Sequence, residues 1–459
     1  MVHRKGVARI AACAALACAG VVRAESAGAL SDNGFSLRPA YLDDMSTQPA
    51  TAPATTEAAS QPAAAAAPPK PLMLGLEKIG IGKPLEDANI TFGGYIEGGY
   101  TISNQNPPRN PIGNQLAGRV FDTKNKRVVL DQIDFFFDRP VDYGKAATNH
   151  TIDIGGHVDV IYGWDSGLIH SDGILDNPAT LGEPNGHYKT RAHPENQIDL
   201  NQAYVDVALP IGSGLRIRAG KFVTLFGEEI INPTGDPLYS HSYLFGFAIP
   251  FTHTGVLGEY KLNDDFLLDA GITRGWNQSL KDNNGDPDFL GGVTFTPQES
   301  DFLKKWKFIA NLSLGPQTTH DNADWWTVVD LQAYFTATDK LTLSVNFDYG
   351  DAPHAVMPKS AQWYGIAGYA SYVLNDYFTL NGRAEWYDDN NGFTLGLPGG
   401  LNIYEATVGV AIKPLPHDTI GQNLMIRPEV RGDYAAKRFF DAGKDYYQVT
   451  FGMDAYFTF

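Results

Sequence analysis

The segment 446–459 constrains the fold most, because it ends the chain as an alternating strand. Successive side chains of a strand point to opposite faces, so the pattern predicts one apolar face and one wet face. Such a strand fits either the edge of a soluble β-sandwich or the closing strand of a transmembrane barrel. The apolar face would carry Tyr447, Val449, Phe451, Met453, Ala455, Phe457 and Phe459, and the wet face Gln448, Thr450, Gly452, Asp454 and Thr458.

From residue 90 onward the alternation recurs in segments of about ten residues, the length that a tilted strand needs to cross a membrane. Two segments break the pattern, because Asp131 shares a face with Ile133, and Asp206 shares one with Leu200 and Tyr204. These breaks predict β-bulges or register errors. The sixteen expected strands lie near 90–102, 127–138, 149–162, 197–209, 214–225, 252–260, 265–275, 289–297, 304–315, 325–337, 341–350, 362–374, 377–387, 402–412, 424–434 and 446–459.

The connections between these segments alternate in length. With the first strand pointing outward, the even-numbered gaps are mostly tight, as at 263–264 and 375–376, whereas odd-numbered gaps such as 163–196 and 226–251 are long. Membrane barrels have short turns on the periplasmic side and long loops outside. The sequence therefore predicts an all-β fold, a transmembrane antiparallel β-barrel of about sixteen strands.

Composition agrees with a barrel. Charged residues make up 19% and aromatic residues 12% of the chain, yet the mean hydropathy is −0.22. Helical membrane proteins are more apolar than this, whereas alternating lipid-facing and water-facing residues average to near neutral.

The N-terminus carries an export signal. Arg4, Lys5 and Arg9 precede an apolar run from Ile10 to Val22, and Ala24 ends a small-residue cleavage site. We expect a signal peptide at 1–24 and export across the inner membrane of a Gram-negative cell. Both cysteines lie in this signal, so the mature chain is expected to have no disulfide.

Residues 25–88 do not alternate like the rest. The run 47–71 is mostly Ala, Pro, Thr and Gln, which bury too little surface to fold. We expect 25–88 to be a periplasmic N-terminal segment with a flexible Ala/Pro-rich linker at 47–71, and 89–459 to be an outer-membrane barrel.

Net charge excludes some partners. Without the signal's four basic residues, 31 Lys and Arg stand against 52 Asp and Glu, a net charge of −21. Such a chain is not expected to bind nucleic acid.

Several blocks of the sequence resemble the β-barrel porin family described as OmpL-like. They are Gln202–Pro210, Gly214–Phe222, Phe226–Glu229, Ile249–Gly255 and Arg274–Trp276. The resemblance covers about residues 90–459 and implies an outer-membrane channel, with outer-membrane lipid around it, small hydrophilic solutes or ions diffusing through it and a homotrimer as a candidate assembly. The ending at Phe459 also resembles outer-membrane barrels, whose assembly machinery reads the last strand.

Charged side chains on the wet faces are candidates for the pore lining, because basic residues on the lipid face would cost about 2–4 kcal/mol each near the midplane. Paired charges that only hold the wall in shape are the alternative. The candidates are Arg216, Arg218, Arg383, Arg427 and Arg431.

The segment Gly227–Phe251 is the candidate constriction. It is too apolar for a solvated loop, so we expect it, as the third external loop, to fold into the lumen. Glu228, Glu229 and Asp236 would then face Arg216 and Arg218 across the eyelet. A loop lying over the mouth or against a second subunit is the alternative.

Other functions find less support. His157, Asp153 and Asp159 lie on one face of a strand and could bind a metal ion. The pairs His170-Ser171 and His241-Ser242 contain the side chains that a hydrolase uses as base and nucleophile, but no hydrolase sequence motif surrounds them. A structural or adhesin-type anchor also stays open. We predict a porin that is not an enzyme and has no cofactor or metal. Its ion selectivity is left open, because the net charge favours cations whereas the arginines favour anions.

Overall fold

The computed structural model describes residues 70–105, 115–174, 196–356 and 359–459. The expected signal peptide at 1–24 and the expected linker up to residue 69 lie outside these residues. Among the described residues, no helix combines the length and apolarity needed to cross a membrane.

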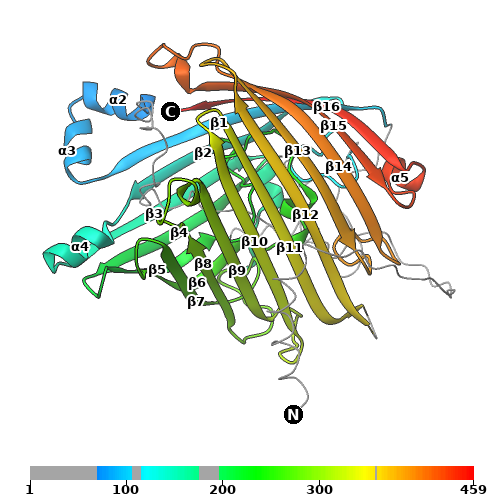
Figure 1. Cartoon of the computed structure of the whole chain (residues 1–459), viewed down its shortest axis with the longest axis horizontal. Helices are drawn as coiled ribbons and strands as arrows, with labels where there is room; N and C mark the ends of the chain where they lie inside the picture. The colour runs from blue at the N-terminus through cyan, green and yellow to red at the C-terminus, as the bar shows by residue number, and fades with distance from the viewer. Residues whose placement is uncertain (1–69, 106–114, 175–195, 357–358) are drawn as a thin grey trace. The chain divides into compact units, whose positions relative to one another are not determined.

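Sixteen antiparallel strands form a closed barrel, in which each strand pairs with its neighbours in the chain and β1 pairs with β16 (Figure 1). The strands are β1 Thr91–Ser103, β2 Arg127–Arg139, β3 Asp153–Gly163, β4 Gln197–Leu209, β5 Leu215–Val223, β6 Thr252–Lys261, β7 Phe266–Thr273, β8 Asp288–Phe295, β9 Trp306–Pro316, β10 Trp325–Thr338, β11 Leu341–Val356, β12 Lys359–Val373, β13 Phe378–Asp389, β14 Leu401–Ile412, β15 Leu424–Ala435 and β16 Tyr447–Thr458. The strand count and order predicted from alternation are confirmed.

Short helices lie between or before the strands. They are α2 Pro71–Lys78, α3 Gly82–Asp87, α4 Tyr143–Asn149 and α5 Phe440–Gly443, with single turns η1 Asp165–Leu168, η2 Leu244–Ala248, η3 Leu303–Lys305 and η4 Gly421–Asn423. The C-terminus, α2, α3 and α4 lie at one end of the barrel and α5 at the other (Figure 1). We call these the short-turn end and the long-loop end.

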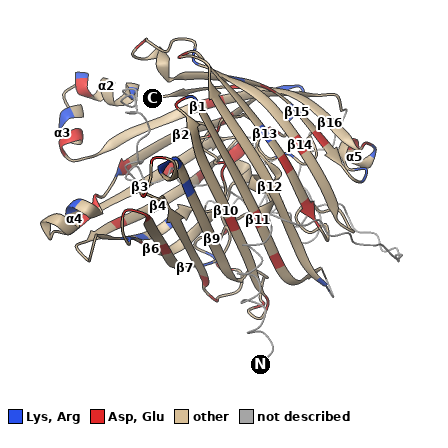
Figure 2. Ribbon diagram, in the orientation of Figure 1, with Lys and Arg blue, Asp and Glu red and all other residues tan. Residues whose placement is uncertain are grey.

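The polarity of the barrel is the reverse of a soluble protein. Along β16, Val449 and Phe451 are exposed on the outside, whereas Thr450 and Asp454 are buried inside. In Figure 2, charged residues are scattered along the mostly uncharged strands and lie close together on α2 and α3. An apolar outer face and a polar lumen are what a bilayer selects, because lipid cannot solvate charge.

Both predicted irregularities are β-bulges. Opposite Glu97 and Gly98 of β1, the register of β2 steps from Gln132 to Leu130 and leaves Asp131 as the extra residue. In the same way, β4 steps from Gln202 to Leu200 opposite β3 and leaves Asn201 as the extra residue. An extra residue changes the phase of the alternation, which is why these strands broke the pattern.

Two parts of the chain differ from expectation. Residues 71–87, for which the sequence predicted no secondary structure, form α2 and α3, because Pro71 begins a helix whose Met73 accepts a hydrogen bond from the Phe92 backbone at 3.4 Å. The third strand begins at Asp153, since α4 occupies the preceding turn and is capped by the Asp142 carboxylate.

Candidate functional site

The loop between β5 and β6, residues 224–251, lies inside the barrel. It begins and ends at the long-loop end, yet Tyr243, Leu244, Phe245 and Ala248 are at most 1% exposed. The rings of Phe245 and Phe251 are 5.2 Å apart. Burying such side chains stabilises each by about 1.5–3 kcal/mol, which is why this loop is not solvated.

Three of the predicted pore-lining arginines donate hydrogen bonds to carbonyl groups of this loop. Arg383 donates to Ser240 O at 2.6 Å, and Arg431 donates to His241 O at 2.5 Å. Arg427 donates to the carbonyls of two further loop residues at 2.8 and 2.6 Å. All three side chains are at most 3% exposed. They are therefore anchors of the loop as well as parts of the wall.

Two glutamates complement them by accepting from loop amides. Glu385 of β13 accepts from the Tyr243 and Leu244 N–H groups, each at 2.7 Å. Glu429 of β15 accepts from the Tyr239 N–H at 2.9 Å. The buried C=O groups of the loop thus bond positively charged side chains of β13 and β15, and its buried N–H groups bond negatively charged side chains of the same two strands.

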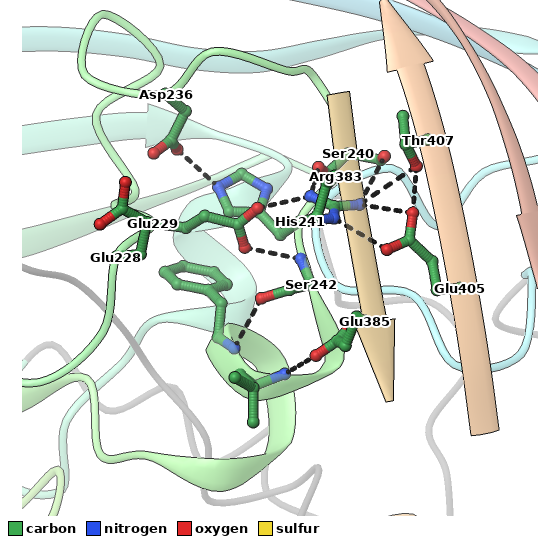
Figure 3. A network of polar contacts seen from close by, with 12 residues as sticks. Glu228, Glu229, Asp236, Ser240, His241, Ser242, Arg383, Glu385, Glu405 and Thr407 are labelled. Atoms are coloured by element: carbon green, nitrogen blue, oxygen red, sulfur yellow. Dashed lines mark hydrogen bonds and ion pairs between the residues drawn. The ribbon is translucent and has the colours of Figure 1, made fainter. Parts of the chain in front are cut away.

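The same arginines also pair with acids of β14, β15 and β16. Arg383 bonds Glu405 of β14 at 3.0 Å, in the network of Figure 3. Arg427 bonds Asp454 of β16 at 2.6 Å, and Arg431 bonds Asp433 at 2.8 Å. These ion pairs compensate the buried charges and hold the guanidinium groups at fixed positions.

Glu229 and Asp236 have partners other than the β5 arginines that the sequence suggested. Glu229 pairs with Arg383 and accepts from the Ser242 N–H at 2.6 Å, whereas Asp236 contacts His241 at 2.9 Å (Figure 3). Burial alone would raise the pKa of Glu229, but Arg383, His241 and the Ser242 bonds hold that pKa below its usual value. Burial raises the pKa of Asp236, although its bond to His241 opposes the rise.

Glu228 is the least engaged of the three loop acids. Its carboxylate accepts from Ser344 Oγ at 2.7 Å, while Oε2 has no hydrogen-bond partner among the described residues. Burial raises the pKa of Glu228 to about 7. This carboxyl therefore changes its charge near neutral pH.

Arg216 and Arg218 lie on the inner face of β5 and pair with neighbouring strands. Arg216 bonds Glu259 at 2.5 Å, and Arg218 makes two bonds to Asp206 at 2.9 and 2.8 Å. The Arg218 guanidinium also lies 3.7 Å from the centroid of the Tyr204 ring.

Several buried residues inside the barrel escaped the sequence analysis. The Arg119 side chain is fully buried and bonds Asp122 and Asp433, each at 2.9 Å. Trp276, Trp326 and Trp363 pack edge-to-face at the long-loop end, with ring centroids 5.6–6.3 Å apart. Trp363 also donates to the carbonyl of Ala248, at the end of η2, at 2.9 Å. In the sequence, the position of three tryptophans near the ends of predicted strands could have indicated this cluster.

His157 and Asp159, which suggested a metal site, bond different residues. His157 bonds Asp138 at 3.1 Å and stacks between Phe136 and Tyr204. Asp159 instead accepts from Asn201 at 2.7 Å.

The serines that suggested a hydrolase bond elsewhere. Ser171 Oγ shares a hydrogen bond with Thr252 at 2.7 Å, and Ser242 Oγ accepts from the Phe245 N–H at 3.1 Å.

Comparisons with known proteins agree with this architecture. Residues 89–459 match the model of a family described as beta-barrel porin-2, OmpL-like. No curated protein matches the chain.

Among solved structures, the fold is similar to an anion-selective porin from Comamonas acidovorans, with a TM-score of 0.51, 9% identity and coverage of 81% of this chain and 99% of that chain. It is also similar to the outer membrane channel DcaP of Acinetobacter baumannii, with a TM-score of 0.50, 13% identity and coverage of 81% and 97%. Such low identities show a shared fold alone.

Proposed function

This chain belongs to the family of OmpL-like β-barrel porins, and we propose that its β5–β6 loop is the constriction that limits diffusion through the barrel. The protein is an outer-membrane porin through which small hydrophilic solutes or ions diffuse passively. We place the short turns in the periplasm and the long loops outside, as in other membrane barrels.

The observation that carries the proposal is the anchoring of the loop to the inner wall. Loop carbonyls accept from Arg383, Arg427 and Arg431, and loop amides donate to Glu385 and Glu429. Opening the loop as a lid would break each of these hydrogen bonds to a charged group, and such bonds are worth about 1.5–3 kcal/mol each. The loop is therefore a fixed narrowing of the pore.

We propose separate roles for the predicted pore residues. Arg383, Arg427 and Arg431 hold the loop, whereas Arg216 and Arg218 line the wall away from it. Among the loop acids, Glu228 is the one that acts on passing ions. Glu229 is paired with Arg383, and Asp236 is hydrogen-bonded to His241. Selectivity at the constriction would follow from that single carboxyl.

The proposal is tested by replacing residues 228–249 with a short Gly/Ser linker and recording single channels in planar bilayers. Conductance should rise, because the linker removes bulk from the lumen while leaving the strand ladder intact. Replacing residues 280–286 of the β7–β8 loop in the same way is the matched control and should leave conductance unchanged. A folded barrel with the shortened β5–β6 loop and wild-type conductance would place the constriction elsewhere.

We also propose that the barrel has no enzymatic activity, because Ser171 and Ser242 bond groups other than their neighbouring histidines. Release of fatty acids by the purified protein would contradict this. A homotrimer, which chemical cross-linking in the membrane tests, also stays a prediction.

A further inference from the structure

A chamber of about 360 Å³ lies inside the barrel, between the β5–β6 loop and the inner wall. Its wall residues come from β11 to β16, close to the short-turn ends of these strands. Small-molecule sites have volumes of about 300–1,000 Å³, so the chamber can hold a small solute.

Hydroxyl groups dominate the lining of this chamber. Seven Ser, Thr and Tyr residues contribute them, from the loop and from β11, β12, β13 and β16. Asn381 adds an amide that already donates to the Pro237 carbonyl at 2.7 Å. A hydroxyl both donates and accepts, so this lining suits a solute whose own groups do both.

The charged groups of the lining are mostly engaged elsewhere. Arg427 bonds Asp454 at 2.6 Å, and Asp236 contacts His241 at 2.9 Å. Lys413 lies exposed near the end of the strands. A strongly charged solute would therefore meet few free countercharges in the chamber.

Two lining groups have no hydrogen-bond partner among the described residues, Glu228 Oε2 and the Tyr369 hydroxyl. They come from different elements, because Glu228 belongs to the loop and Tyr369 to β12. Ser344 links them, since it donates to Glu228 at 2.7 Å and stands directly opposite Tyr369 in the β11–β12 register. Unpartnered polar groups at a site of this size are unfavourable unless water or a solute bonds them.

We propose that the chamber is a binding site for a neutral polyhydroxylated solute of the monosaccharide class, which bonds Glu228 and Tyr369. This rests on the proposed function, because the solute reaches the chamber along the diffusion path past the loop. Sugar hydroxyls can donate to the free carboxylate oxygen and exchange bonds with the tyrosine hydroxyl, whereas an anion would be repelled by Glu228. The porin would then favour such solutes over ethers of similar size.

The test uses the full-length purified porin and glucose. Glucose binding is measured by isothermal titration calorimetry in detergent and by glucose-induced current noise in planar bilayers. Tyr369→Phe and Glu228→Gln should each weaken glucose binding by about threefold to tenfold, the effect of losing one hydrogen bond. Tyr95→Phe is the matched control, because its hydroxyl donates to Gln132 at 2.6 Å and lies outside the chamber.

The outcomes separate this inference from the proposed function. A conducting channel that binds glucose no better than tetraethylene glycol, or equal glucose affinity in Tyr369→Phe and wild type, overturns the binding site and leaves the porin function standing. Binding of an organic amine in preference to glucose would also overturn it, in favour of a cation at Glu228. A barrel that does not conduct would contradict the proposed function, while calorimetry would still decide whether glucose binds.

Discussion

At the scale of single residues, most charged side chains of the lumen bond peptide groups or one another. Arg431 is fully buried between Asp433 and the His241 carbonyl, so the passing solute does not meet its full charge. Most charged side chains in the lumen therefore hold the constriction loop in place. Groups with free hydrogen-bonding capacity, such as the Glu228 carboxylate, act on the solute.

Glu228 should make ion selectivity depend on pH. Because burial raises its pKa to about 7, the carboxyl is mostly neutral below that pH and mostly charged above it. We expect preference for cations to increase between about pH 6 and about pH 8. Reversal potentials in a salt gradient would measure this.

In Glu228→Gln the pH dependence should be lost, and the variant should keep the lower preference at both pH values. Glu299→Gln changes an exposed turn carboxyl and should behave like wild type. A pH dependence that persists in Glu228→Gln would assign the titration to another group.

Arg383 should matter more for stability than for selectivity. Replacing it with alanine leaves Glu229 and Glu405 buried without their common partner, which should lower the free energy of unfolding by about 3–5 kcal/mol. Urea unfolding in detergent measures this loss. Arg438→Ala removes an exposed arginine and should be nearly neutral. Equal stabilities of the two variants would contradict the anchoring role.

At the scale of elements, alternation predicted the strands and even the bulges, because a period of two is a local property of the chain. It also placed Arg383 on the wet face. The partners of Arg383 could not be predicted, since Ser240 and Glu229 lie 143 and 154 residues earlier in the chain. Helices α2 and α3 were missed because short apolar segments beside a low-complexity run gave no periodic signal.

The bulge in β2 leads us to expect different effects from deleting different single residues of this strand. Asp131 is the extra residue opposite β1, so deleting it should restore a regular ladder and keep every other side chain on its present face. Deleting Phe136, farther from the bulge, should instead turn Asp134 or Asp138 toward lipid. We expect the first variant to show the heat-modifiable migration of a folded barrel and the second to lose it. Loss of folding in both would mean that the bulge itself is required.

At the scale of the whole molecule, closure depends on the pairing of the first and last strands. Phe459 exchanges backbone hydrogen bonds with Gly94 of β1 at 2.9 and 3.0 Å, and its ring lies 5.3 Å from that of Phe135. The terminal residue thus completes the ladder that leaves the barrel without an edge. The whole ladder, and not this one residue, supplies the stability of the closed state.

Deleting Phe459 should therefore impair assembly more than stability. The deletion removes two backbone hydrogen bonds and a partly buried ring, together about 2–5 kcal/mol, which is small for a sixteen-strand ladder. The purified variant, refolded in detergent, should keep heat-modifiable migration and lose little thermal stability. In cells, most of it should fail to reach the surface, because we propose that the assembly machinery recognises the end of this last strand. Phe451→Ala removes a similar ring while keeping the terminus, and should reach the surface normally. Wild-type surface levels of the truncated protein would assign Phe459 a purely structural role.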